Sequence, residues 1–286
     1  MKTNQEIIKN LRQFKIKSKW DSNHLFAGQY KSGFKGHGII FKELREYQLG
    51  DDIRFIDWNV TARMQRTYTR VFEEEKETCI YILIDNSSST LFGSSESKRD
   101  LITQLCADLC FSAIKNNNKT GLILFSDSIE KHIPPSKNVE QIPFLIKVLA
   151  TMQSSRGKTN ISKALEFINN IISKRSLIFI VSDFLDKNFE KPLGILANRH
   201  NVIGIRIEDK MDKVLPNIGL LEISDLETGE KFMIDSANSH IQKNYIEQFD
   251  TNSNYSKNTF AKARASLITL ETGKDYHLTV QNFLNS

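Results

Sequence analysis

The chain has 286 residues, of which 40% are hydrophobic and 26% are charged. This composition supports a complete hydrophobic core, which does not need disulfides or metal ions to stabilise it. The length suits one large domain, or one domain with a smaller additional part. Residues 1–20 hold six of the 39 basic and one of the 34 acidic residues, and so carry the whole formal net charge of +5. The rest of the chain is balanced, which argues against a nucleic-acid-binding protein.

The basic N-terminal residues belong to a predicted amphipathic helix from Thr3 to about Lys17. Thr3 and Glu6 have the spacing of a capping box, and four apolar side chains share one face of the helix, Ile7, Ile8, Leu11 and Phe14. We interpret the basic residues as the solvated face of this helix. The alternative is a weak peripheral contact of residues 1–20 with an anionic membrane or with RNA.

The cysteines and the hydropathy pattern indicate a cytoplasmic protein. Cys79, Cys106 and Cys110 are too few and too unevenly spaced for a disulfide framework, and a zinc site would need a fourth ligand. They are typical of buried thiols in a reducing compartment. No apolar run approaches the roughly 20 residues that a membrane span needs, and the polar N-terminus lacks a signal-peptide core.

From Cys79 onward, apolar runs of strand length alternate with segments of helical periodicity. The predicted strands are 79–85, 121–127, 176–183 and 201–209, and the predicted helices are 97–115, 142–152, 161–173 and a short one before the last strand. Continuous apolar strands that alternate with helices predict an α/β fold, with a mainly parallel sheet and helices on both of its faces.

The C-terminal third continues with other patterns. Residues 219–235 are expected to form a hairpin that turns at Glu227–Gly229, and residues 238–272 to be helical, in one piece or two. Three parts are therefore expected: an N-terminal helix and segment at 1–75, the α/β domain at 76–250, and a C-terminal helical extension at 251–286.

Oxygen-bearing side chains follow several of the predicted strands. They are Asp85-Asn86-Ser87-Ser88-Ser89, Ser126-Asp127 and Ser182-Asp183, with Thr159 just before the helix that begins at Ile161. Because ligands bind outside the carboxyl ends of strands in such sheets, these groups are expected to converge. A set of hard oxygen ligands suits Mg²⁺ or Mn²⁺. The alternative is that Ser87 and Ser89 cap a helix while Asp85 and Asp183 bind loop amides; we favour the metal.

The pattern DNSSS, with the threonine of GKTN and the aspartate of VSDF, resembles the metal-ion-dependent adhesion site (MIDAS) of von Willebrand factor type A (vWA) domains. The resemblance implies a Rossmann-like fold and a metal site at Asp85, Ser87, Ser89, Thr159 and Asp183. In that family the hydroxyls contact the ion directly or through water, the aspartates act mostly through water, and the sixth position accepts a partner's carboxylate. This chain departs from the pattern at Arg156-Gly157-Lys158, where two glycines are usual.

The segment at 45–63, REYQLGDDIRFIDWNVTAR, is the second distinctive motif. Gly50 permits a tight turn, Asp51 or Asp52 can cap a short helix, and a strand is expected from Tyr68. Asp57 is either a catalytic acid or part of an ion-pair and hydrogen-bond network that holds the segment to the neighbouring domain. We favour the network, because neither a nucleophile nor a histidine accompanies Asp57.

This segment, placed just before a type A domain, closely resembles the family called "domain of unknown function 58", over roughly residues 25–250. The resemblance implies a bacterial adaptor that works with a MoxR-type AAA+ ATPase and other vWA proteins in assembling or activating client complexes. Many members of that family carry membrane helices near the N-terminus, and none is evident here.

Two functions remain open from the sequence. The first is a non-enzymatic interaction module whose metal accepts an acidic side chain of a protein partner. The second is a Mg²⁺-dependent hydrolase of phosphate esters, with Asp57 or Asp127 as the base. The GKT at 157–159 is not a phosphate-binding P-loop, because that motif needs glycine where the chain has Met152. We favour the interaction module.

Overall fold

A computed structural model of the chain describes residues 38–75, 79–94, 97–116, 118–138, 141–151, 159–224 and 230–285. These residues belong to two compact units, one before and one after the segment 76–78. The predicted N-terminal helix, with the basic residues 1–20, lies outside the described residues. So do most of the glycine-rich stretch at 28–38 and the Arg156-Gly157-Lys158 departure.

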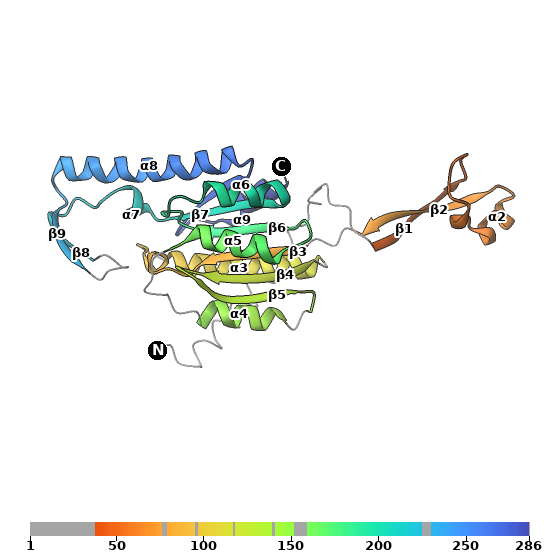
Figure 1. The fold of residues 1–286 in the computed structure, drawn as a ribbon, viewed down its shortest axis with the longest axis horizontal. Helices are drawn as coiled ribbons and strands as arrows, with labels where there is room; N and C mark the ends of the chain where they lie inside the picture. The colour runs from red at the N-terminus through yellow and green to blue at the C-terminus, as the bar shows by residue number, and fades with distance from the viewer. Residues whose placement is uncertain are drawn as a thin grey trace. The chain divides into compact units, whose positions relative to one another are not determined.

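The first unit, residues 38–75, is an antiparallel hairpin with two short helices inserted between its strands (Figure 1). Strand β1 (Gly38–Glu46) pairs with β2 (Tyr68–Glu75), which confirms the strand expected from Tyr68. Between them lie the 3₁₀ helix η1 (Ile53–Phe55) and helix α2 (Trp58–Met64). Asp52 caps η1, and Gly50 has a φ of +107°, a left-handed conformation that glycine adopts without strain.

The second unit is built on a six-stranded sheet. Its order is β10–β7–β6–β3–β4–β5, and every neighbouring pair is parallel except β4 with β5. The strands are β3 (Cys79–Asp85), β4 (Lys119–Phe125), β5 (Ile129–Ser136), β6 (Leu177–Ser182), β7 (Asn201–Glu208) and β10 (Ser266–Glu271). The chain builds outward from β3 on one side and then returns to its other side at β6, which is the Rossmann-like, doubly wound order. The predicted α/β class is confirmed.

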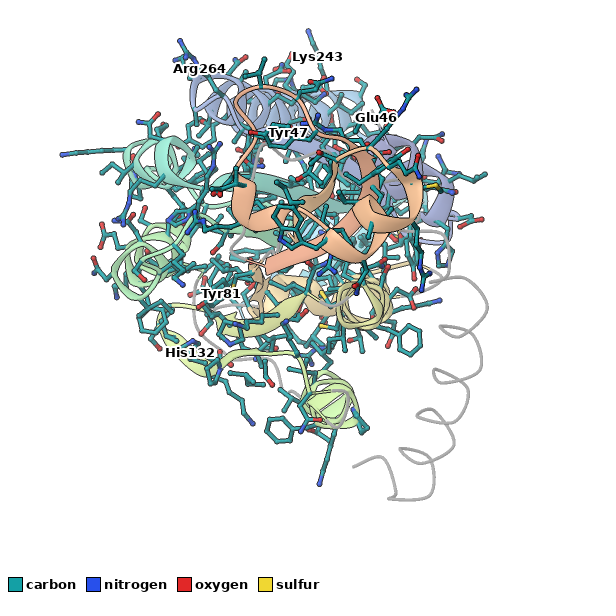
Figure 2. The ribbon with its side chains drawn as sticks, turned by 90° about the vertical axis from the view of Figure 1, so that its right-hand side faces the viewer. Glu46, Tyr47, Tyr81, His132, Lys243 and Arg264 are labelled. Carbon is teal, nitrogen blue, oxygen red and sulfur yellow. The ribbon has the colours of Figure 1, made fainter. Side chains whose placement is uncertain are left out.

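Helices cover both faces of this sheet, and each face has its own hydrophobic core. One core joins the sheet to α3 (Lys98–Lys115), α4 (Gln141–Thr151) and α9 (His277–Asn285). The other joins it to α5 (Ile161–Ile171), α6 (Glu190–Arg199) and α8 (Ser239–Lys262). Figure 2 looks along the strands and shows Tyr81 on the α5 side of β3 and His132 on the edge strand β5. The predicted helices at 97–115, 142–152 and 161–173 are confirmed.

The connection from β7 to α8 carries the predicted hairpin. Helix α7 (Lys210–Lys213) is followed by β8 (Leu220–Ser224) and β9 (Lys231–Asp235), which pair antiparallel. The predicted turn at Glu227–Gly229 lies outside the described residues. Within the part of the chain that the structure describes, no helix has both the length and the apolar character needed to cross a membrane.

The prediction of helix throughout 238–272 is wrong over its last part. Helix α8 ends at Lys262, and Arg264 takes a left-handed φ of 55°. The following residues form β10, which pairs in parallel with β7 as the sixth strand, and helix α9 then contributes Val280 and Leu284 to the core. The C-terminal residues are therefore an integral layer of the α/β unit, because the short apolar sequence SLITLE completes the sheet.

Strand β5 was not predicted from the sequence, for a physical reason. Of its side chains, only Ile133 is fully buried, and the strand carries Pro134 and Pro135. Proline lacks a backbone donor and is tolerated at a sheet edge, where one side of the strand has no neighbour. An edge strand of this kind lacks the continuous apolar run that marks β3, β4, β6 and β7.

Candidate metal centre

The predicted ligands lie at the carboxyl end of the sheet, where the strand order reverses. Asp85 is the last residue of β3, and Asp183 directly follows the neighbouring strand β6. Thr159 is brought there by the start of α5, where Asn160 N donates to Ser126 O at 2.8 Å. Figure 1 shows the loop after β3 at the same end of the sheet as α7 and the β8–β9 hairpin.

Asp85 is fully buried and accepts hydrogen bonds from three segments. Ser182 Oγ donates to Oδ2 at 2.6 Å, and the Ser87 amide donates to Oδ1 at 2.9 Å. Thr159 Oγ1 lies farther away, at 3.4 and 3.5 Å from the two carboxylate oxygens. The structure therefore brings Thr159, 74 residues away in sequence, to Asp85, as predicted.

The environment of Asp85 disfavours its charged form. Burial, and then the negative charge of nearby Asp183, raise the pKa of Asp85 from 3.8 to about 7, against the opposing effect of hydrogen bonds from Ser182 and Ser87. Near neutral pH the carboxyl group is therefore poised between its two protonation states. A divalent cation would compete directly with that proton, because metal ligands must be deprotonated.

Ser87 and Ser89 point their hydroxyls toward each other, with the two Oγ atoms 2.9 Å apart. Ser87 precedes the 3₁₀ helix η2 (Ser88–Leu91), but its side chain makes no capping hydrogen bond. The cap that the alternative interpretation required is therefore not made by Ser87. Instead, Thr90 Oγ1 donates to Ser87 O at 2.7 Å and fixes the turn that presents the two serines.

Asp183 is the least satisfied member of the predicted set. It is 4% exposed, and Oδ1 accepts a long hydrogen bond of 3.4 Å from the Leu185 amide. Among the residues that the structure describes, Oδ2 has no hydrogen-bond partner. The loop amides that bind Asp85 and Asp183 are those of the alternative interpretation, yet they leave this buried oxygen without a hydrogen bond, and its remaining contact is an ion pair of 3.5 Å with Lys98.

The backbone after Asp183 is held in an unusual conformation. Phe184 has a φ of 54°, in a region that bulky residues rarely adopt. Its amide donates to Ser182 Oγ at 3.0 Å, and its buried ring packs edge-on against Phe260 at a centroid distance of 5.2 Å. The turn that presents Asp183 is therefore over-determined by its surroundings, a pattern that clusters at functional sites.

Two residues of this region were not singled out from the sequence. Ser182 appeared only as the neighbour of Asp183, although its hydroxyl makes the shortest hydrogen bond to Asp85. Lys98, at the start of α3, is 2% exposed, and its ammonium lies 3.5 Å from Asp183 Oδ2 and 2.9 Å from Asp212 Oδ2. A signal for Lys98 existed, because it extends the buried helical stripe of Leu101, Leu105 and Leu109 by one turn.

The donor set fits a hard divalent cation. Two buried carboxylates and three hydroxyls converge from β3, β6 and the start of α5, and one carboxylate oxygen, Asp183 Oδ2, has an ion pair with Lys98 in place of a hydrogen bond. Within the described residues, no three His, Cys, Asp or Glu side chains are grouped as metal ligands. The predicted set is of a different kind, since it has only two such residues and takes its other oxygens from serine and threonine, which suits Mg²⁺ or Mn²⁺.

The two carboxylates considered as bases have other environments. Asp127 is exposed and accepts hydrogen bonds from Ser126 Oγ at 3.4 Å and Ser128 Oγ at 3.0 Å. Asp57, in the first unit, caps α2 through the amides of Asn59 and Val60 and pairs with Arg70 at 2.8 Å.

The favoured network interpretation of Asp57 is supported within the hairpin unit. The bonds from Arg70, first, and from the Val60 amide lower the pKa of Asp57. Arg70 and both amides belong to residues 38–75, so these bonds stabilise the hairpin unit itself.

The chain is similar in sequence to one protein family and to an individual relative. The family described as "Protein of unknown function DUF58" matches residues 43–255. The uncharacterized protein Rv1480 of Mycobacterium tuberculosis is 27% identical over 282 residues, which cover 96% of this chain and 88% of that protein.

Two solved structures show a distant likeness to the fold. BatB from Bacteroides thetaiotaomicron matches with a TM-score of 0.49 and 13% identity, over 72% of this chain and 96% of that one. Proximal thread matrix protein 1 from the mussel byssus, whose structure has a zinc-occupied MIDAS motif, matches with a TM-score of 0.42 and 16% identity, over 73% of this chain and 47% of that one. The fold described above rests on the strand order of the chain itself.

Proposed function

We propose a function from one premise, that this chain belongs to the DUF58 family of proteins of unknown function. Its α/β unit, in our proposal, is a non-enzymatic protein-interaction module that works through a divalent cation at Asp85, Ser87, Ser89, Thr159 and Asp183. One observation carries the proposal: oxygen ligands from three segments converge at the carboxyl end of the sheet, where the buried Asp183 lies close enough to Asp85 to raise its pKa.

Each residue has a distinct role in this proposal. The hydroxyls of Ser87, Ser89 and Thr159 contact Mg²⁺ or Mn²⁺, and Asp85 and Asp183 balance its charge, mostly through water. Ser182 and the Ser87 amide hold the Asp85 carboxylate in place. When bound, the cation supplies a Lewis-acidic position for one carboxylate of a partner. Such a contact is charge-assisted and depends on a single acidic side chain.

The interaction module is favoured over a hydrolase of phosphate esters. Asp57 already binds Arg70 and the first amides of α2, and Asp127 is exposed beside two serine hydroxyls, so neither is arranged as a general base. We expect no turnover of a generic phosphate monoester by the full chain with either Mg²⁺ or Mn²⁺. Metal-dependent turnover that Asp85→Ala abolishes would instead establish the hydrolase.

The partner in this proposal is a protein that offers an acidic side chain. The family resemblance makes a MoxR-type AAA+ ATPase the first candidate, with other vWA proteins beside it. We expect tagged full-length chain to retain such an ATPase from a lysate of its own cells in Mg²⁺, and to lose it in chelator.

Two variants make this co-purification specific. Asp85→Ala should lose the partner in Mg²⁺, whereas the exposed Asp127→Ala should retain it, with the bound proteins identified by mass spectrometry. Equal retention by Asp85→Ala, or equal retention in chelator, would show that the contact does not use this site.

A further inference from the structure

Lys98 places a positive charge inside the protein, next to a proposed metal ligand. Its side chain is 3% exposed, and its ammonium lies between the carboxylates of Asp183 and Asp212. The ammonium is therefore charged, and it provides part of the positive charge that the proposed cation would also bring to Asp183.

The two carboxylates hold Lys98 unequally. The contact to Asp212 Oδ2 is short, at 2.9 Å, and that oxygen is itself fixed by the Asp209 amide at 2.7 Å in the capping box of α7. The contact to Asp183 Oδ2 is longer, at 3.5 Å, and is an ion pair at the outer limit of hydrogen-bond distance. Lys98 is thus anchored at α7 and only loosely attached at Asp183.

The surroundings leave room for this contact to change. A cavity of about 200 Å³ opens beside the pair and is lined by Lys98, Asp183 and Asp212, together with residues of α8 such as Tyr245 and Phe249. The ring of Phe92 lies 5.7 Å from the ammonium and offers it a further favourable contact. Lys98 can therefore release Asp183 while keeping Asp212 and gaining water.

We propose that Lys98, held in place by Asp212, competes with the divalent cation for Asp183. Lys98 thereby sets the metal affinity of the site. Its ammonium pairs with Asp183 in the metal-free protein, and it yields Asp183 and stays with Asp212 when a cation binds. This inference rests on the proposed function. In the metal-free protein, the Lys98 ammonium compensates part of the negative charge of the two buried carboxylates. Metal occupancy then depends on the competition between this ammonium and the divalent cation.

The test is a calorimetric titration of the full chain with Mg²⁺, comparing wild type with Lys98→Met. Removing a competing charge should tighten Mg²⁺ binding by about tenfold or more, because like charges in a low-dielectric site repel strongly. A matched control is Lys191→Met on the exposed face of α6, which should leave the affinity unchanged.

A second readout separates competition from a purely structural ion pair. In chelator, Lys98→Met should melt roughly 6–15 °C below wild type, because Asp183 and Asp212 lose their shared cation. Saturating Mg²⁺ should then raise the melting temperature of this variant more than that of wild type. Lys98→Gln, which can still donate a hydrogen bond to Asp212, is the variant to use if Lys98→Met does not fold.

The outcomes are distinguishable. Tighter Mg²⁺ binding by Lys98→Met or Lys98→Gln supports the competition. Wild-type Mg²⁺ binding with equal or weaker binding by both variants overturns it and leaves the proposed function standing, with Lys98 as a residue that merely positions Asp183. If neither wild type nor the variants bind Mg²⁺ or Mn²⁺, the proposed metal site fails, and this inference fails with it.

Discussion

Asp85 makes the metal-free protein less stable as pH rises. Its pKa is about 7 in the folded chain against an ordinary value of 3.8, so between these values the folded state holds a proton that the unfolded state has released. Stability therefore falls from about pH 4 to pH 7 and then levels off. A buried carboxylate kept at this cost is understandable where it serves a ligand.

Asp85→Asn replaces the buried carboxyl group with a neutral amide of similar size. In chelator at pH 7.5, this variant should be more stable than wild type by about 1–3 kcal/mol, because it removes a buried charge while losing some of the bonds from Ser182 and Ser87. The difference should shrink by more than half at pH 5, where wild-type Asp85 is protonated. Urea unfolding at the two pH values measures it.

Asp127→Asn is the matched control for that experiment. This carboxylate is exposed, so its replacement should change stability by no more than about 0.5 kcal/mol at either pH. A lower stability of Asp85→Asn than of wild type at both pH values would show that the charge of Asp85 is not a burden on the metal-free fold.

The candidate site was only partly predictable from the sequence. The alternation of Asp85, Ser87 and Ser89 after an apolar strand is local, and therefore visible in sequence. Lys98 and Ser182 were missed because their roles depend on which segments meet. Lys98 lies on the buried stripe of α3, which the sequence shows, but its position beside Asp183 depends on how α3 packs against the end of the sheet.

At the scale of elements, α8 lies close to β7 because of one glycine. A Cβ added at Gly204 would stand 2.5 Å from the ring of Phe260 and 2.7 Å from Leu267, far inside van der Waals contact. Phe260 in turn packs on Phe184, next to Asp183. The spacing between β7 and α8 therefore bears on the geometry of the candidate site.

Gly204→Ala tests this link. We expect a loss of about 1–3 kcal/mol in the free energy of unfolding, because overpacking forces either the ring or the helix to move. Gly194→Ala, on α6 with no atom within 4 Å of the added Cβ, is the control and should be neutral or stabilising. Equal stability of the Gly204 variant and wild type would mean that α8 is not held as tightly as described.

Which strands the sequence reveals depends on their burial. Strands β3, β4, β6 and β7 are buried on both faces and have continuous apolar runs. The sequence therefore predicts that these segments are strands and that they alternate with helices. Strands β5 and β10 lie at the two edges and bury only some of their side chains, Ile133 in the first and Ile268 and Leu270 in the second. An edge strand is specified mainly by its single neighbour, which the local sequence does not contain.

At the scale of the whole chain, the Asp57 network and the proposed metal ligands belong to different compact units. Asp57, the cap of α2 and Arg70 all belong to the hairpin unit, whereas the five proposed ligands belong to residues 79–285. The long motif at 45–63 is thus explained by the internal construction of the hairpin unit. It does not have to supply a catalytic group.

Asp57→Asn distinguishes these two interpretations. It should destabilise the hairpin unit, seen as faster amide hydrogen exchange in α2 and β2, because the ion pair with Arg70 and the strength of the cap are reduced. Mg²⁺ affinity at the sheet unit should stay within about twofold of wild type. A large loss of Mg²⁺ affinity would instead show that Asp57 contributes to the site.

The central claim is that a divalent cation binds at the carboxyl end of the sheet through Asp85 and its neighbours. Its most direct test is a calorimetric titration of the metal-free full chain with Mg²⁺, for wild type and Asp85→Ala in parallel. We predict one Mg²⁺ per chain for wild type and binding at least about tenfold weaker for the variant. Equal Mg²⁺ affinity of the two proteins, or no binding by wild type, would contradict this account.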